Sequence, residues 1–134
     1  MNTKLIAKIL AGIIALMFLV FGARYMFAPA GILDTAGFDP AGVSVLGLST
    51  LRATVGASWL TFGILIVMHS VRAGEDGAMR FAVLFLLLSV IARIISMVAD
   101  GVVDGTVRNL VPVSLMLIVS IASVILFSRS EATE

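Results

Sequence analysis

Four long apolar runs, separated by short polar connections, make up almost the whole chain. The runs cover about residues 5–27, 45–71, 79–99 and 110–127. A helix needs roughly 20 mainly apolar residues to cross a bilayer, and each run is close to that length. The pattern therefore predicts an all-α, polytopic, integral membrane four-helix bundle, in which residues 1–134 form a single transmembrane domain.

The connections between the runs differ in length. Residues 28–44 form the one long connection, and the sequence PAG occurs in it twice. Proline and glycine mark turns, so we expect an outer loop here, with room for a short interfacial helix. The other two connections are short, which predicts that the second, third and fourth helices are antiparallel neighbours. Pro112 is expected in the first turn of the fourth helix, where proline is tolerated.

Lysine and arginine are distributed unequally between the two ends of the predicted helices. Cytoplasmic loops of membrane proteins carry an excess of these residues. One end would hold Lys4, Lys8, Arg72, Arg80 and Arg129, and the other only Arg24 and Arg108. We therefore predict a multi-pass protein of the cell inner membrane with both termini in the cytoplasm. The outer side would be acidic, with Asp34, Asp39, Asp100 and Asp104.

The N-terminal run could also be interpreted as a cleavable signal peptide. Lys4 and Lys8 precede an apolar run that ends near the small residues Ala28-Pro29-Ala30, an arrangement typical of secretory signals. However, the run is long for a signal, and Arg24 interrupts the approach to the cleavage point. These features favour a retained first helix.

Composition agrees with a bilayer environment and excludes several classes of function. Hydrophobic residues make up 60% of the chain and charged residues 13%, with a mean hydropathy of +1.17. Soluble domains carry about 25% charged residues. The net charge of +1 gives no indication of a nucleic-acid partner. With no cysteine and only His69, the chain offers no disulfide, no cysteine-ligated metal and no bis-histidine haem, so we expect no metal and no cofactor.

Two arginines, Arg52 and Arg93, lie inside the apolar runs. A charged side chain at the centre of a membrane helix costs about 2.5–3.5 kcal/mol on insertion scales, and such residues usually face the bundle interior or a wet cavity. Each arginine lies about seven residues, or roughly 10 Å, from the outer end of its helix. We therefore expect the two guanidinium groups at a similar depth.

Both arginines belong to stripes with the spacing of one helix face. The stripes are Ser89, Arg93, Ser96 and Asp100 on the third helix, and Arg52, Gly56, Trp59 and Gly63 on the second. The glycines would let another helix approach closely. We predict an outward-facing polar cavity lined by Arg52, Trp59, Arg93, Ser96 and Asp100, with Asp34 and Asp39 as candidate counter-charges. Alternatively, each arginine extends to the outer lipid headgroups and has no binding role.

The chain offers little for catalysis, and we assign no catalytic residue. The first, second and fourth runs contain no Asp or Glu, so proton antiport through a buried carboxylate is not expected. His69 would lie at the opposite surface from the arginines, too far to activate a serine nucleophile. We expect the serines at positions 58, 89, 96, 120 and 123 to form hydrogen bonds between helices. Ala7, Ala11 and Ala15 have the small-residue spacing that favours close helix packing.

Two segments carry a family resemblance: STLRATVGASWLTFG and RFAVLFLLLSVIARIISMVADG. They resemble a family of small bacterial membrane proteins known as domain of unknown function 4345 and, more loosely, the DoxX-like group. The matching motif positions are Arg52, Gly56, Arg93, Ser96, Asp100 and Gly101. Thr50 stands where the family often has an acidic residue, and Ala92 where it often has glycine. The resemblance to the first family implies the four-helix topology but does not indicate any particular activity. The likeness to the DoxX-like group implies an association with quinones and redox partner subunits.

Three functions remain open from the sequence. The favoured one is a non-enzymatic binding or accessory protein, whose cavity holds a small anionic or amphipathic ligand such as a lipid. This function requires a concave site that contains the arginines. The first alternative is a structural or assembly subunit of a homo-oligomer or a larger membrane complex, which requires a flat face of small residues. The second is a small transporter or enzyme for a lipid-soluble molecule, which requires a base or a gate.

Overall fold

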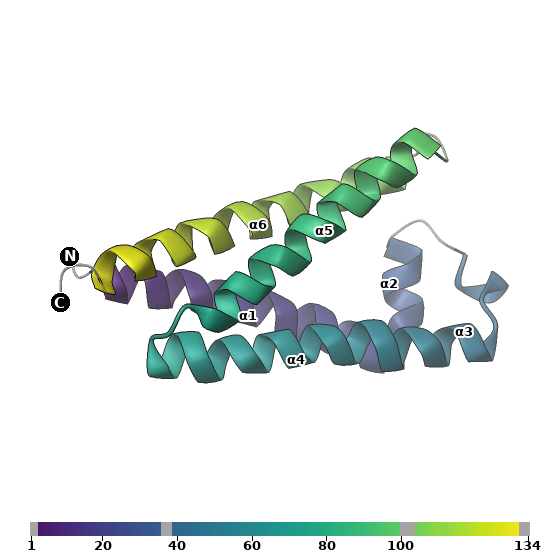
Figure 1. Cartoon of the computed structure of the whole chain (residues 1–134). Helices are drawn as coiled ribbons and strands as arrows, with labels where there is room; N and C mark the ends of the chain where they lie inside the picture. The colour runs from purple at the N-terminus through teal and green to yellow at the C-terminus, as the bar shows by residue number, and fades with distance from the viewer. Residues whose placement is uncertain (1–2, 36–38, 100–103, 132–134) are drawn as a thin grey trace.

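The computed structural model describes residues 3–35, 39–99 and 104–131. These residues are helical almost throughout and include no β-strand. Four of the helices are long and apolar enough to cross a membrane (Figure 1). The prediction of an all-helical fold with four helices long and apolar enough to cross a membrane is therefore confirmed.

The four long helices follow one another along the chain, and the longest connection lies between the first and the second. The first is α1 (Thr3–Phe27), the third is α5 (Gly77–Ala99) and the fourth is α6 (Asp104–Glu131). The second is one continuous helix, Val45–Ala73, which we call span 2. It contains two π-helical segments and consists of α3 (Val45–Thr50), η2 (Leu51–Gly56), α4 (Ala57–Leu65) and η3 (Ile66–Ala73).

The predicted boundaries agree with the first three long helices to within about two residues, but the fourth differs. Helix α6 begins at Asp104 and not near residue 110, because its first turns are too polar to be recognised as part of an apolar run. Pro112 consequently lies in the interior of α6 and not in its first turn, so that prediction is wrong. An interior proline donates no N–H to the preceding turn.

The long connection contains two short helices, α2 (Pro29–Thr35) and η1 (Pro40–Gly42). The Asp39 carboxylate accepts a hydrogen bond from the Ala41 N–H at 2.9 Å and so caps η1. The Ser44 hydroxyl accepts the Gly47 N–H at 3.1 Å and caps the start of span 2 in the same way. Side-chain caps therefore fix where these helices begin.

Helix α1 is the centre of the bundle. It packs along α6 on one side and along span 2 on the other, and α5 packs against α6. By contrast, α4 and α5 make few contacts and diverge away from the turn that joins them (Figure 1). The prediction that span 2 and α5 pack as neighbours is therefore wrong over most of their length. The order around the bundle is α4, α1, α6, α5, and we call the loosely packed side between α4 and α5 the open seam.

Glycines explain why span 2 packs against α1. A Cβ atom on Gly22 of α1 would lie 2.6 Å from the Leu60 backbone nitrogen. A Cβ on Gly56 would lie 2.9 Å from the Met26 nitrogen, and one on Gly63 2.7 Å from Leu19 Cγ. The expectation that Gly56 and Gly63 admit a close neighbour is confirmed, and that neighbour is α1.

Small residues also allow α1 and α6 to pack closely. Ala7, Ala11 and Ala15 are buried, and the Ser123 hydroxyl of α6 donates to the Ala7 carbonyl at 3.0 Å. The prediction of hydrogen bonds between helices is correct for Ser123. It is wrong for the serines at positions 58, 89 and 120, which donate to carbonyls four residues earlier in their own helices. A serine can satisfy its hydroxyl locally in this way wherever no acceptor on another helix is in reach.

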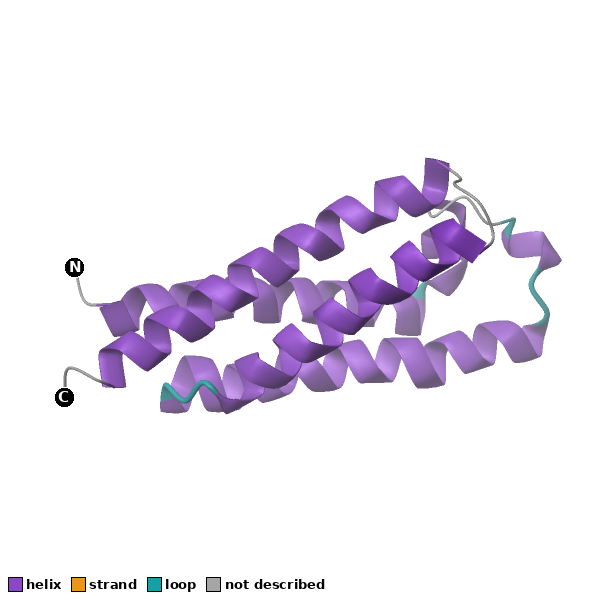
Figure 2. Cartoon of the chain, turned by 45° about the horizontal axis from the view of Figure 1, so that its top comes forward, coloured by secondary structure: helices purple, strands orange, loops and turns teal. Residues whose placement is uncertain are grey.

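The two termini lie at the same end of the bundle as the turn between span 2 and α5 (Figures 1 and 2). We call the half that contains this end the closed half, and the half that contains Tyr25, Val45 and Ala99 the open half. In the closed half, the Lys8 ammonium donates to the Arg72 carbonyl at 3.2 Å. Gly74 ends span 2 with a φ of 79°, a left-handed conformation that favours glycine.

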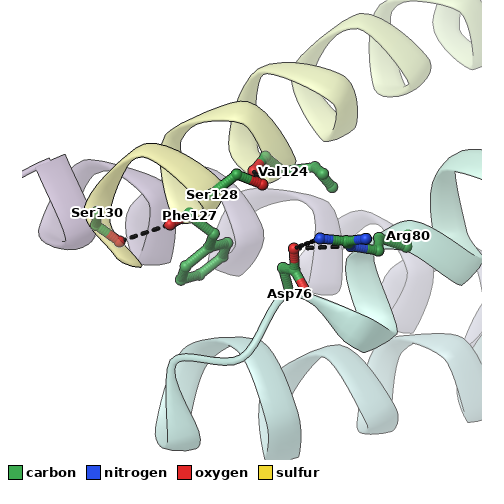
Figure 3. Close-up of polar contacts among 6 residues, drawn as sticks. All are labelled: Asp76, Arg80, Val124, Phe127, Ser128 and Ser130. Atoms are coloured by element: carbon green, nitrogen blue, oxygen red, sulfur yellow. Dashed lines mark hydrogen bonds and ion pairs between the residues drawn. The ribbon is translucent and has the colours of Figure 1, made fainter. Parts of the chain in front are cut away.

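The start of α5 is held by an ion pair in the closed half. The Arg80 Nε donates to Asp76 Oδ2 at 2.7 Å, one helical turn away (Figure 3). On the neighbouring last turns of α6, the Ser128 and Ser130 hydroxyls donate to carbonyls of their own helix. These polar side chains therefore have partners within the chain, whereas the buried Ser70 hydroxyl of η3, in the same half, has none among the described residues.

Candidate ligand-binding pocket

A cavity of about 300 Å³ lies in the open half, where the helices separate. Ligand pockets in proteins usually measure roughly 300–1,000 Å³. All four long helices line this one. The lining residues are Phe21 and Tyr25 of α1, Trp59 of α4, Arg93 of α5, and Asn109, Pro112, Val113 and Met116 of α6.

Aromatic rings from three helices pack around Trp59, one of the lining residues. The centroids of Phe62 and Phe85 lie 4.8 Å apart, those of Phe18 and Trp59 5.0 Å apart, and Trp59 meets Phe85 edge-on at 6.0 Å. Such pairs contribute about 0.5–1.5 kcal/mol each beyond their buried area. We call Phe18, Trp59, Phe62 and Phe85 the aromatic floor. It joins α4 to α5 across the open seam.

Polar side chains lie nearer the end of the helices than the apolar lining does. Tyr25 is two residues from the end of α1, and Asn109 is five residues from the start of α6. Arg93 is six residues from the end of α5, or about 9 Å along the axis. Trp59 and Met116 are several residues deeper in their helices. The pocket therefore has a polar outer part and an apolar inner part.

Arg93 gives the pocket its charge. Its side chain is half-buried, and no hydrogen bond or ion pair joins it to another residue within the described ranges. A guanidinium carries five N–H donors, and it pairs best with the two oxygens of a carboxylate or phosphate. The lining can therefore offer an anion a strong donor group next to apolar surface.

The structure brings only part of the predicted site together. Arg93 and Trp59 line the same cavity, whereas Arg52 is exposed and is not among the lining residues in the described parts of the chain. The reason is the length of α1. Gly56 packs against Met26, one residue before the end of α1. Arg52 lies four residues before Gly56, about one helical turn closer to the start of span 2, and so beyond the end of α1.

The other predicted site residues are not among the described lining residues. Ser96 is half-buried one turn beyond Arg93 on α5, and Asp100 lies outside the described residues. Asp34 and Asp39 are exposed, and Asp39 caps η1 as described above. No ion pair joins either carboxylate to Arg52 or Arg93 in the described structure. A role of these residues in binding stays a prediction.

Sequence reasoning missed three polar or rigid lining residues, Tyr25, Asn109 and Pro112. Tyr25 is the sole tyrosine of the chain and lies near the end of the first apolar run. Asn109 precedes the fourth apolar run, so the pattern predicts it in a connection. The signal for both was their closeness to the outer ends of the helices, where polar groups of neighbouring helices come together.

Comparison with known families now gives this arrangement a context. The family described as "Domain of unknown function (DUF4345)" matches residues 6–127. The chain belongs to this family. The match includes all eight lining residues of the pocket. Comparisons with curated proteins and with solved structures give no match. The looser likeness to the DoxX-like group is not shown by these comparisons.

The described lining residues carry groups that can bind a ligand. The lining residues offer a guanidinium, a phenol, an amide and a thioether, with aromatic and aliphatic surface. A general base or nucleophile would require a carboxylate, imidazole, thiol or activated hydroxyl. None of the eight described lining residues is a carboxylate, imidazole or thiol.

Proposed function

We propose that this DUF4345 protein is a multi-pass inner-membrane protein whose outward-facing pocket binds a small anionic or amphipathic ligand. The supporting observation is the position of Arg93, a cation with no partner among the described residues, in the wall of a cavity with an apolar inner part. An anion would supply the missing counter-charge, and aromatic surface would hold an apolar portion of the ligand.

The orientation proposed for the protein rests on its positive residues. Lys4, Lys8 and Arg72 gather in the closed half, where the carbon chains of both lysines approach Gly74. Membrane proteins retain such clusters on the cytoplasmic side. The termini then lie in the cytoplasm, and the pocket opens toward the outer side. Because the chain lacks cysteine, a cysteine at position 34 should react with a membrane-impermeant maleimide in intact cells, whereas one at position 75 should not.

The binding proposal is tested by thermal unfolding of the purified protein in a zwitterionic or neutral detergent. Titration with phosphate, short-chain carboxylates and fatty acids should raise the melting temperature for at least one anion. Arg93→Gln should lower the affinity for that anion by about tenfold or more, because a hydrogen bond to a charged group contributes about 1.5–3 kcal/mol. Arg93→Lys should retain part of the response.

Arg52→Gln is the matched control. It removes the same charge from the exposed arginine of span 2, which is not among the described lining residues. The response to the anion should be unchanged in this variant. If no anion shifts the melting temperature, or if both variants lose the response equally, the proposed pocket function is wrong.

The alternative role as a subunit of a larger assembly is favoured by one observation on α5. Only 11% of its most apolar window is buried within the chain. The side chains of Phe81, Ile95 and Val98 are exposed. A partner helix could cover this surface. The mass of the protein extracted in a mild detergent distinguishes the two cases, because an assembly subunit would be recovered with stoichiometric partners or as an oligomer.

A further inference from the structure

We infer that the ligand is an anionic amphiphile with a single apolar chain, and that it enters the pocket sideways from the bilayer through the open seam. This inference rests on the proposed binding function and specifies the ligand class and its source. It distinguishes a ligand taken from the membrane from one taken from the aqueous phase.

The first argument is the way the bundle is closed. Three of its four sides are formed by pairs of helices with many contacts, namely α4 with α1, α1 with α6, and α6 with α5. The fourth side is bridged by the Phe62–Phe85 and Trp59–Phe85 ring contacts. Arg93 lies eight residues, or about 12 Å, beyond Phe85. In the open half the two helices of the open seam, α4 and α5, diverge (Figure 1). If these helices span the bilayer, this side of the pocket faces acyl chains.

The second argument is the order of chemical groups along the pocket. Arg93, Tyr25 and Asn109 lie toward the helix ends, and the Trp59 ring and Met116 lie deeper. A molecule that enters from the bilayer with its head toward the headgroups and its chain inward has the same order. Its carboxylate or phosphate would meet Arg93, and its chain would lie against Trp59 above the aromatic floor.

The third argument is size. The cavity of about 300 Å³ corresponds to about ten water molecules at roughly 30 Å³ each. This volume suits an anionic head and the first part of one chain more than two chains side by side. The pocket therefore favours a fatty-acid-like or single-chain phosphate lipid over an intact two-chain phospholipid.

Trp59 provides a direct test, because it is the only tryptophan of the chain and it lines the pocket. Bromine atoms quench tryptophan fluorescence only at short range. The protein, in nanodiscs of an unbrominated zwitterionic phospholipid, is titrated with a fatty acid brominated in its chain. A brominated alcohol of the same chain length is the neutral control. The acid should quench Trp59 at concentrations about tenfold or more below the alcohol, because only the acid can pair with Arg93.

Variants separate binding in the pocket from quenching by lipid around the bundle. Arg93→Gln should shift the quenching curve of the acid to that of the alcohol, whereas Arg52→Gln should leave it unchanged. Circular dichroism and the melting temperature without ligand verify that each variant is folded, and Arg93→Lys should restore part of the selectivity for the acid.

The outcomes also separate this inference from the proposed function. Equal quenching by the acid and the alcohol, or selectivity that survives in Arg93→Gln, would overturn the inference. If water-soluble anions stabilise the protein through Arg93 while the brominated acid shows no selective quenching, the pocket is a site for aqueous anions. In that case the proposed function stands and the membrane route is wrong.

Discussion

The closed half and the open half of the bundle differ in how many of their charged side chains have partners within the chain. In the closed half Lys8 holds the Arg72 carbonyl, Asp76 holds Arg80, and Ser123 joins α6 to the Ala7 carbonyl of α1. In the open half, Arg93 lines a cavity and has no partner among the described residues. The two halves have the same helices, so the difference arises from where the helices touch.

The contrast between the two halves indicates how a small apolar protein can be stable and still contain a pocket. Close contacts through glycine and alanine hold α1 against span 2 and α6. The aromatic floor then holds α4 and α5 together near the middle of the bundle. Beyond the floor the open seam is not needed for packing, so a charged side chain can lie there without disturbing the core.

Removing a ring of the aromatic floor should have the largest effect. Phe85→Ala removes contacts with Phe18, Trp59 and Phe62, and it should lower the free energy of unfolding by about 2–3 kcal/mol. Phe81→Ala is the matched control on the same helix, because Phe81 is 68% exposed, and it should change stability by less than about 0.5 kcal/mol. Both are measured by titration with a denaturing detergent. Equal losses would mean that the floor does not join the two helices.

The closeness of α1 and span 2 is tested at Gly22. An added Cβ would clash with the Leu60 backbone, so Gly22→Ala should destabilise the fold by about 1–3 kcal/mol. Gly12→Ala, on the same helix, places its Cβ 4.0 Å from Val71. Since alanine is the better helix former, this control should be neutral or stabilising by about 0.5–1 kcal/mol. If Gly22→Ala is also stabilising, the backbones are not in close contact.

Removal of the hydrogen bond between α6 and α1 in the closed half should lower stability by a smaller amount. Ser123→Ala leaves the Ala7 carbonyl without its side-chain donor and should cost about 0.5–1 kcal/mol. Ser128 donates only within α6 and is exposed, so Ser128→Ala should cost less than about 0.3 kcal/mol. The two melting temperatures, measured side by side, give the comparison. A larger loss for Ser128→Ala would contradict the assignment.

The smallest expected difference in stability is between variants of two arginines, one in each half. Arg80→Met removes the ion pair with Asp76 and should lower stability by about 0.5 kcal/mol. Arg93→Met removes a half-buried charge that has no described partner and should leave stability unchanged or slightly higher. Both variants are compared in detergent without added ligand. A loss above about 1 kcal/mol in Arg93→Met would show that this arginine has a structural role.

The sequence predicted the four long apolar helices because uninterrupted apolar runs of about 20 residues are typical of helices that cross a membrane. It also identified the glycine face of span 2, but it could not tell that this face packs against α1 and not against α5. The choice of partner depends on matching surfaces such as Gly22 against Leu60, which lie far apart in sequence. Helix depth alone suggested that Arg52 and Arg93 share a site. The end of α1 at Phe27 leaves Arg52 exposed, a fact of tertiary structure that residue spacing does not contain.

Cross-linking of paired cysteines tests the open seam most directly, because the chain contains no cysteine of its own. One double variant, Phe62→Cys with Phe85→Cys, replaces the two rings whose centroids lie 4.8 Å apart. The other, Trp59→Cys with Arg93→Cys, places thiols on two helices that line the cavity. In nanodiscs, the shortest bifunctional thiol reagent should join the first pair efficiently, whereas the second pair should require a longer reagent. Equally efficient joining of both pairs by the shortest reagent would mean that α4 and α5 pack along their whole length and that the pocket is absent.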